Sequence, residues 1–197
     1  MVDDHEPSRR LLEDVLGSAG YRVMSASTGA AAIEWAKRLH PKLVILDLAL
    51  PDLSGLYISK LLRSQSETAS VSIIAVTARP IPGVGRAAIG NGSDAYLAKP
   101  IRLGDLTLMV STLLSRHIPP EDRMLLAGIL PSGAIRWTAR RKALLIIAIR
   151  NGMITPTAAS ERFAFAEDEL SQWQQAFDRH GVDGLLATKP RRRSRSD

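Results

Sequence analysis

Cysteine is absent from this chain of 197 residues. Its absence excludes a disulfide framework and a thiolate metal site, and it fits a reducing compartment. Long apolar runs are also lacking, since none approaches the roughly 18 residues of a membrane span. The N-terminus is acidic, whereas a secretory signal begins with basic residues. Together these absences predict a soluble, cytoplasmic protein without a membrane partner.

Basic residues are unevenly distributed along the chain, which has a net charge of +6. Residues 1–117 hold 13 Lys and Arg against 11 Asp and Glu, a net charge of +2. Residues 118–197 hold 13 against 9, a net charge of +4 in a shorter piece. A basic C-terminal part indicates contact with nucleic acid or with an acidic protein surface. A solubilising tail is the alternative, because residues 191–195 alone supply four of the charges.

Strand and helix patterns alternate over the first 117 residues, which predicts an α/β fold with a doubly wound parallel sheet. Between Thr77 and Ala95 the prolines and glycines leave only residues 86–89 with a helical pattern, so a short or irregular helix is expected there. We expect helices over residues 8–19, 28–39, 55–64 and 103–116, and strands over residues 21–25, 43–47, 71–77 and 95–99.

The strand over residues 43–47 is the centre of this part. Its apolar residues run without alternation into Asp47, as in a strand that is buried on both faces of a parallel sheet. The carboxyl ends of such strands share one edge, where ligands bind. The other polar residues expected at this edge are Asp3, Asp4, Thr77 and Lys99.

Clustered carboxylates at one edge need a cation to remain ionised together, and hard oxygen ligands suit Mg²⁺. A carboxylate beside Mg²⁺, a hydroxyl and a lysine is suited to attack on a phosphoryl group. In that chemistry the carboxylate is the nucleophile, and the cations neutralise the phosphoryl oxygens. The pattern therefore predicts phosphoryl chemistry at Asp47.

At these residues the chain from Asp3 to about Arg116 resembles a two-component response-regulator receiver domain, with a flavodoxin/CheY-like fold. The residues that carry the resemblance are the pair Asp3-Asp4, Asp47 with Pro51 and Gly55 at their offsets, Thr77-Ala78, and Tyr96 three residues before Lys99-Pro100.

The resemblance implies that Asp47 is the phosphoacceptor and that a sensor histidine kinase is the phosphodonor. It also implies that Asp4 binds Mg²⁺ directly, Asp3 through water, and Ala49 through its backbone carbonyl. Thr77 and Lys99 would contact the phosphoryl oxygens, and Tyr96 would change rotamer on activation. From the residues alone, Tyr96 could instead be a half-buried strand aromatic.

Two features depart from the receiver pattern. Only Met1 and Val2 precede the acidic pair, so the first strand of the sheet looks truncated, which would leave its neighbours unpaired. We therefore expect either a true start several codons upstream or a truncated receiver, which the intact mass of the protein from its natural host would decide. The second departure is the Pro/Gly-rich region after Thr77, where receivers form their output face. A homodimer stays open, but the usual dimer surface is in doubt.

Residues 118–197 are expected to form a separate, all-helical part. We expect a receiver over residues 1–117, a linker over 118–133, a helix-turn-helix domain over 134–189 and a disordered basic tail over 190–197. Within the domain, helices are expected over residues 138–151, 155–163 and 167–180, with Thr155-Pro156 as a helix start.

Residues 130–189 resemble the alphaproteobacterial SciP-like family, which inhibits the cell-cycle regulator CtrA. The resemblance rests on residues 135–142, Ile154-Thr155, Ala158-Ala159, residues 161–163, residues 170–174 and residues 180–185. Members of that family are associated both with DNA and with another transcription regulator, so both remain open as output partners.

Two sets of side chains are candidates for contact with DNA or a partner protein. A basic cluster suited to phosphates consists of Arg136, Arg140, Arg141 and Lys142. Glutamines that could reach base edges on the third helix are Gln172, Gln174 and Gln175. Three acids at the start of that helix, residues 167–169, weaken direct base readout.

The sequence as a whole predicts a response regulator, not an enzyme, whose phosphorylation on Asp47 controls a DNA-binding output and so transcription. The alternative is a phospho-gated protein-interaction module.

Overall fold

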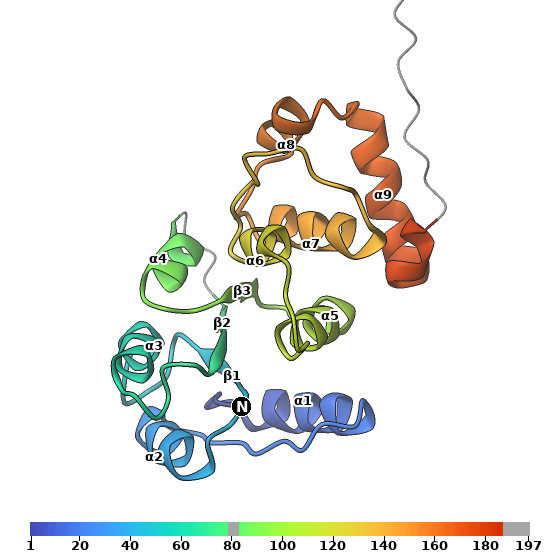
Figure 1. Cartoon of the computed structure of the whole chain (residues 1–197). Coiled ribbons are helices and arrows are strands. Elements are labelled where there is room, and N and C mark those ends of the chain that lie inside the picture. Colours follow the sequence, from blue (N-terminus) through green and yellow to red (C-terminus); the bar gives the residue numbers. More distant parts are fainter. Residues whose placement is uncertain (79–82, 187–197) are drawn as a thin grey trace, which may run out of the picture.

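The computed structural model describes residues 1–78 and 83–186 of the chain (Figure 1). The basic tail predicted over residues 190–197 lies outside the described residues. The strands are β1 (Leu43–Asp47), β2 (Ser72–Thr77) and β3 (Ala95–Ala98). The helices are α1 (Glu6–Ser18), α2 (Gly29–Leu39), α3 (Gly55–Ser64), α4 (Val84–Gly90), α5 (Leu103–Leu113), α6 (Pro120–Leu126), α7 (Ala139–Arg150), α8 (Pro156–Phe163) and α9 (Glu167–His180), followed by the 3₁₀ turn η1 (Gly181–Leu185).

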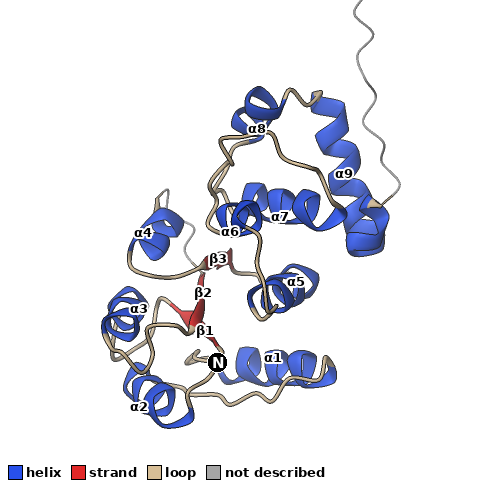
Figure 2. Cartoon of the chain, viewed as in Figure 1, coloured by secondary structure: helices blue, strands red, loops and turns tan. Residues whose placement is uncertain are grey.

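The three strands form a parallel sheet in the order β1-β2-β3. Asp47 lies opposite Val76, and Thr77 lies opposite Ala98, so the carboxyl ends of the strands meet at one edge. Helices cover both faces (Figure 2). On one face the apolar core includes α1 and α5, and on the other it includes α2 and α3. The predicted α/β class and its parallel, doubly wound sheet are confirmed.

Local sequence accounts for the helix boundaries that matter most for this arrangement. The hydroxyl of Thr28 accepts a hydrogen bond from the backbone N–H of Ala31 and so caps α2. Thr155 caps α8 in the same way, and Pro156 occupies the first helical position, where no N–H is needed. Gly29 is buried against the side chains of Ile58 and Leu53, so its missing Cβ lets α2 approach α3.

The first three residues take the place of a first strand. Val2 pairs with Leu46 on one side and with Ala26 on the other, and its backbone bonds Ile45 and Asp47. The strand predicted over residues 21–25 is wrong, because only Ala26 bridges to the N-terminal segment. Beside this segment the described chain offers only the backbone of Met1 to Asp3, which bonds Met24 and Ala26 and is too short to form a ladder along residues 21–25.

An apolar groove of about 710 Å³ lies beside the N-terminal segment, and Tyr21, Trp35 and Leu43 are among its lining residues. Met1 also lines the groove, and its amino group donates a hydrogen bond to the carbonyl of Met24 at 2.6 Å. Burial lowers the pKa of this amine to about 6, while the charge of Glu13 opposes the shift. The expected upstream start stays a prediction.

The lowered pKa of this amine predicts a stability that rises with pH. Between pH 6 and pH 8.0 the unfolded chain holds a proton that the folded chain has released, so the free energy of unfolding increases across this window. We expect a gain of roughly 1–2 kcal/mol, allowing for partial solvent contact, because one pKa unit corresponds to about 1.4 kcal/mol. Urea unfolding of the chain beginning at Met1 measures this gain. Acetylation of the amine removes the titrating group, and an equal gain after acetylation would contradict the assignment.

The C-terminal part is helical, with the three helices predicted between residues 138 and 180 formed as α7, α8 and α9. The region predicted as a linker contains an additional helix, α6, which packs against α7. Asp122 on α6 is buried and ion-paired with Arg140 and Arg141. Aromatic rings from Trp137, Phe163, Phe165 and Trp173 pack together, and Trp173 is buried in the core.

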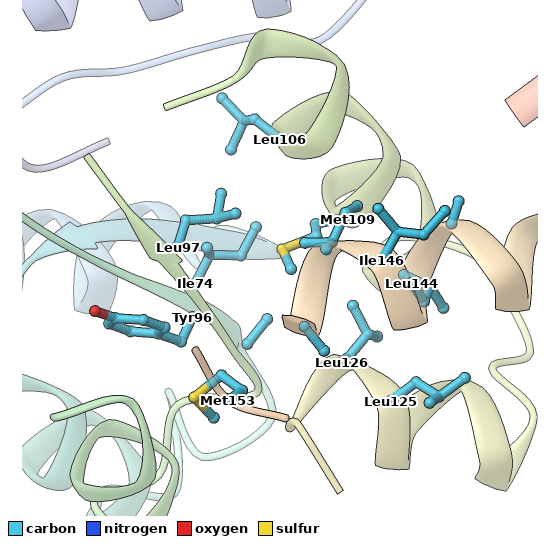
Figure 3. Close-up of a cluster of buried hydrophobic side chains, with 14 of the residues drawn as sticks. Ile74, Tyr96, Leu97, Leu106, Met109, Leu125, Leu126, Leu144, Ile146 and Met153 are labelled. Atoms are coloured by element: carbon cyan, nitrogen blue, oxygen red, sulfur yellow. The ribbon is translucent and has the colours of Figure 1, made fainter. Parts of the chain in front are cut away.

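The cores of the two parts are continuous. Buried side chains of the receiver sheet and α5, such as Leu97 and Met109, belong to the same cluster as Leu126 and Ile146 of the helical part (Figure 3). The chain therefore packs as one body over the described residues, with α6 and α7 next to β3 and α5 (Figure 1).

Candidate functional site

Three carboxylates converge where the N-terminal segment and β1 end. Asp47 is the last residue of β1, and Asp3 and Asp4 directly follow the bridging residue Val2. Each of the three offers an oxygen within 4.8 Å of the others. Asp3 and Asp47 are buried, whereas Asp4 is exposed. The predicted acidic cluster is therefore present at the carboxyl edge of the sheet.

Lys99 supplies the positive charge at this cluster. Its ammonium donates hydrogen bonds to Asp3 Oδ2 at 2.7 Å and to Asp47 Oδ2 at 2.5 Å. Burial lowers the pKa of Lys99, but the hydrogen bonds and charges of Asp3 and Asp47 outweigh it, so the net direction is upward. The lysine therefore stays protonated at neutral pH and compensates the buried carboxylates.

Backbone groups fix the two buried carboxylates. The N–H of Ala49 donates to Asp47 Oδ1 at 2.8 Å, and the N–H of His5 donates to Asp3 Oδ1 at 2.9 Å. The guanidinium of Arg9 donates to the carbonyls of Asp3 and Asp4 at 2.7 and 2.9 Å. These bonds leave the acidic side chains in defined positions. The sequence predicted no role for Arg9. Its position in a helical pattern does not show that its side chain reaches the backbone carbonyls of Asp3 and Asp4.

Glycine at position 55 allows the loop after β1 to close. A Cβ on Gly55 would overlap the carbonyl oxygen of Asp47 and the Cα of Leu48. Asp52 in the same loop accepts hydrogen bonds from the N–H groups of Gly29 and Ala30, both at 2.9 Å. These bonds lower the pKa of Asp52 and join the loop to the start of α2.

Thr77 and Tyr96 occupy different parts of the sheet. Thr77 is buried at the carboxyl end of β2, and its carbonyl accepts the backbone N–H of Lys99 at 2.8 Å. Tyr96 is buried in β3, and its hydroxyl has no hydrogen-bond partner among the described residues. Burial raises the pKa of Tyr96. The Tyr96 hydroxyl therefore makes no hydrogen bond to the acidic cluster in the described structure.

The family model of the response regulator receiver domain matches residues 1–111. The chain belongs to this receiver family. The polar-differentiation response regulator DivK of Brucella ovis is 34% identical to it over 101 residues, which are 51% of this chain and 82% of DivK. Receiver domains are generally signalling modules, and those of two-component systems accept a phosphoryl group from sensor histidine kinases.

Solved receivers have the same fold. The chemotaxis protein CheY4 of Vibrio cholerae is 26% identical, with a TM-score of 0.54, and the match covers 57% of this chain and 94% of CheY4. The receiver domain of the sensor histidine kinase PA1611 from Pseudomonas aeruginosa is 31% identical, with a TM-score of 0.52 and coverage of 56% and 90%. That receiver was crystallised with a magnesium ion coordinated in its active-site cleft.

Residues 114–193 match a second family model, DUF1153, which describes proteins of unknown function. The resemblance of this part to the SciP-like family and its helix-turn-helix therefore stay predictions. None of the helices within residues 1–78 and 83–186 has the length and apolar character to cross a membrane.

Three of the four residues in the predicted basic cluster of the helical part, Arg140, Arg141 and Lys142, are ion-paired or buried. Arg140 pairs with Asp122 at 2.7 Å, and Arg141 binds Asp122 at 2.7 Å and Glu121 at 3.1 Å. Lys142 is buried, with its ammonium 4.4 Å from the centre of the Trp173 ring. The remaining candidates lie nearer the surface: Arg136, Gln172 and Gln175 are exposed, and Gln174 is half-buried.

Proposed function

We propose that a sensor histidine kinase phosphorylates this receiver on Asp47. The observation that carries the proposal is the buried Asp47 carboxylate, held by the N–H of Ala49 beside the ammonium of Lys99. A carboxylate oxygen attacks phosphorus as the bond to the donor nitrogen breaks, and the donor retains its electron pair. Lys99 and Thr77 then contact the phosphoryl oxygens. We place this reaction in the cytoplasm.

The donor set fits Mg²⁺. Asp3, Asp4 and Asp47 offer three carboxylate oxygens within 4.8 Å, and in the described structure Lys99 is the ammonium that bonds two of them. Hard oxygen donors of this kind, with the backbone carbonyl of Ala49, would hold the ion. When bound, Mg²⁺ neutralises charge on the phosphoryl oxygens.

Phosphorylation by a small donor tests this proposal. Acetyl phosphate with Mg²⁺ is expected to add the mass of one phosphoryl group to the intact protein, because the acceptor site needs only a donor and a cation. Chelation of the metal with EDTA is expected to prevent the addition. Intact-mass spectrometry measures both results, and labelling that is independent of Mg²⁺ would contradict the proposed metal site.

We further propose that residues 134–189 are the output domain and that it binds DNA as a helix-turn-helix, joined to a receiver over residues 1–117 by residues 118–133. Gln172, Gln175 and Arg179 lie three and four residues apart on α9 and are all exposed, which supports a shared contact face. Arg136 is exposed near the start of α7 and could reach a phosphate.

The second candidate is binding of another transcription regulator. It is favoured by the ion pairs of Arg140 and Arg141 with Asp122 and by the burial of Lys142, which leave few cations for phosphate contacts. It is also favoured by the exposed acid Asp168 at the start of α9, the helix end that normally approaches DNA.

The salt dependence of DNA binding separates the two candidates. Each phosphate contact contributes about −0.9 to the slope of log K against log salt concentration, so a face with few available cations predicts a slope of only about −2 to −3. Fluorescence anisotropy with promoter DNA measures it. No DNA binding at low salt, with retained binding to a regulator protein, would favour the second candidate.

A further inference from the structure

Asp4 differs from the other two carboxylates of the acidic cluster in how it is held. Asp3 and Asp47 are buried, and each accepts a backbone N–H and the ammonium of Lys99. The carboxylate of Asp4 is exposed, and it makes no hydrogen bond or ion pair in the part of the chain that the structure describes. The direction of this side chain therefore depends on the backbone that carries it.

Arg9 holds this backbone. Its guanidinium Nη1 donates to the carbonyl of Asp3 at 2.7 Å and to the carbonyl of Asp4 at 2.9 Å, and the second of these is the only hydrogen bond of Asp4 among the described residues. The two carbonyls belong to the peptide units on either side of the Asp4 Cα. Together the two bonds therefore fix the direction in which the Asp4 side chain leaves the backbone.

Helix geometry brings the Arg9 side chain back to this loop. The backbone N–H of Arg9 donates to the carbonyl of His5 at 3.2 Å, so Arg9 lies one turn into α1. Side chains of an α-helix lean toward the helix N-terminus, which here is the end next to Asp4. The following residue, Arg10, is exposed and pairs with Glu6 at 2.5 Å. Two adjacent arginines thus have the same charge and different partners.

The charge of Arg9 and its hydrogen bonds have opposite consequences for a divalent cation at the acidic cluster. The charge alone disfavours Mg²⁺, because like charges repel. The hydrogen bonds favour it, because Mg²⁺ demands a nearly octahedral arrangement of oxygens at about 2.0–2.1 Å. A carboxylate that samples several directions provides this arrangement for only part of the time, and the affinity falls in proportion. The sign of the change in affinity when Arg9 is replaced therefore identifies the dominant effect.

We propose that Arg9 is a positioning residue of the Mg²⁺ site, and that it orients the Asp4 carboxylate toward Asp3 and Asp47 through the two backbone carbonyls. This inference rests on the proposed function, since the ion is the one that phosphorylation of Asp47 requires. Arg9 acts on the ion only through the backbone of Asp4. Loss of its two hydrogen bonds weakens Mg²⁺ binding about tenfold, at the lower end of the range for residues that orient metal ligands.

Titration of the full chain with Mg²⁺, followed by NMR, tests this role. The amide signal of Ala49 reports the ion, because its N–H is bonded to Asp47. Arg9→Met keeps an unbranched stem and removes the donors and the charge, so the dissociation constant of Mg²⁺ is expected to rise about tenfold. Arg9→Lys keeps the charge and a donor without the rigid fork, so its affinity is expected to lie between the two.

Arg10→Met is the matched control. It removes the same charge from the adjacent position and leaves the bonds of Arg9 in place. Its Mg²⁺ affinity is expected to equal that of the wild type or to be tighter by up to about twofold, since an exposed charge is screened by salt. Weakening in Arg10→Met as large as in Arg9→Met would overturn the positioning role.

The rate of labelling by acetyl phosphate supplies the second readout. Arg9→Met is expected to be labelled more slowly than the wild type at low Mg²⁺ concentration, and most of this difference is expected to disappear at saturating Mg²⁺. The dispersion of the amide spectrum shows whether each variant folds, and Arg9→Lys alone decides the case if Arg9→Met does not fold.

Failure of this inference is distinguishable from failure of the proposed function. A wild-type chain that binds Mg²⁺ without being labelled would refute Asp47 as the acceptor, and the NMR affinities would still decide the role of Arg9. A wild-type chain that binds no Mg²⁺ would refute the metal site, and the role of Arg9 with it. Mg²⁺ binding by both Arg9 variants as tight as that of the wild type, or tighter, would refute the positioning role alone.

Discussion

Asp47→Asn is expected to abolish phosphoryl transfer from acetyl phosphate completely. The substitution keeps the size and shape of the side chain, and the amide oxygen can still accept the N–H of Ala49. It removes the anionic oxygen that attacks phosphorus and the charge that binds Lys99, so no acyl phosphate can form. Intact-mass spectrometry should show no added phosphoryl group under conditions that label the wild type.

Asp52→Asn is the matched control for this result. Asp52 is in the loop that follows β1, but its carboxylate binds the first N–H groups of α2 and lies outside the acidic cluster. Its loss should weaken a helix cap without removing the nucleophile. Labelling of Asp47→Asn at the wild-type level would reject Asp47 as the acceptor. Loss of labelling in Asp52→Asn alone would do so as well.

Asp122→Ala is expected to lower the free energy of unfolding by roughly 2–4 kcal/mol, a large effect for one side chain. Its carboxylate is 1% exposed and binds Arg140 and Arg141, each at 2.7 Å. Removing one member of a buried ionic group leaves charges that are no longer compensated, and the cost exceeds that of a surface pair. The upper end of the range is reduced because Arg140 remains partly in solvent. Urea unfolding measures the change.

Asp14→Ala is the control for the loss of a carboxylate, because Asp14 is exposed on α1. It should change stability by no more than about 0.5 kcal/mol. If Asp122→Ala were as mild as Asp14→Ala, α6 would not be fixed by its ion pairs. If it unfolded the helical domain while leaving phosphorylation intact, the two parts would be less interdependent than their shared core indicates.

The sequence predicted elements whose signals are local. The uninterrupted apolar run before Asp47 and the cap at Thr155 required only neighbouring residues, and both were found where expected. The helix α6 was missed because residues 118–133 were assigned to a linker, although Pro120 is suited to the first position of a helix. The strand over residues 21–25 was wrong because a strand forms only where another backbone lies beside it.

The acidic site was predictable because parallel strands bring their carboxyl ends to one edge whatever the details of packing. Asp3, Asp4, Asp47 and Lys99 accordingly lie together. The basic cluster could not be judged in the same way, because the acid that neutralises it, Asp122, is in a segment assigned to a linker. Residue type predicts the charge of a side chain, but the distant partner determines whether that charge is available.

The core shared by the sheet and α6–α7 has a consequence for how the chain unfolds. Buried apolar residues of β3 and α5 belong to one cluster with those of the helical part, so neither part can melt without exposing the other's contact surface. A single cooperative transition by calorimetry follows, with equal calorimetric and van't Hoff enthalpies. A receiver cut off after residue 117 would expose side chains such as Met109, which lies beside Ile146 (Figure 3), and would be prone to self-association.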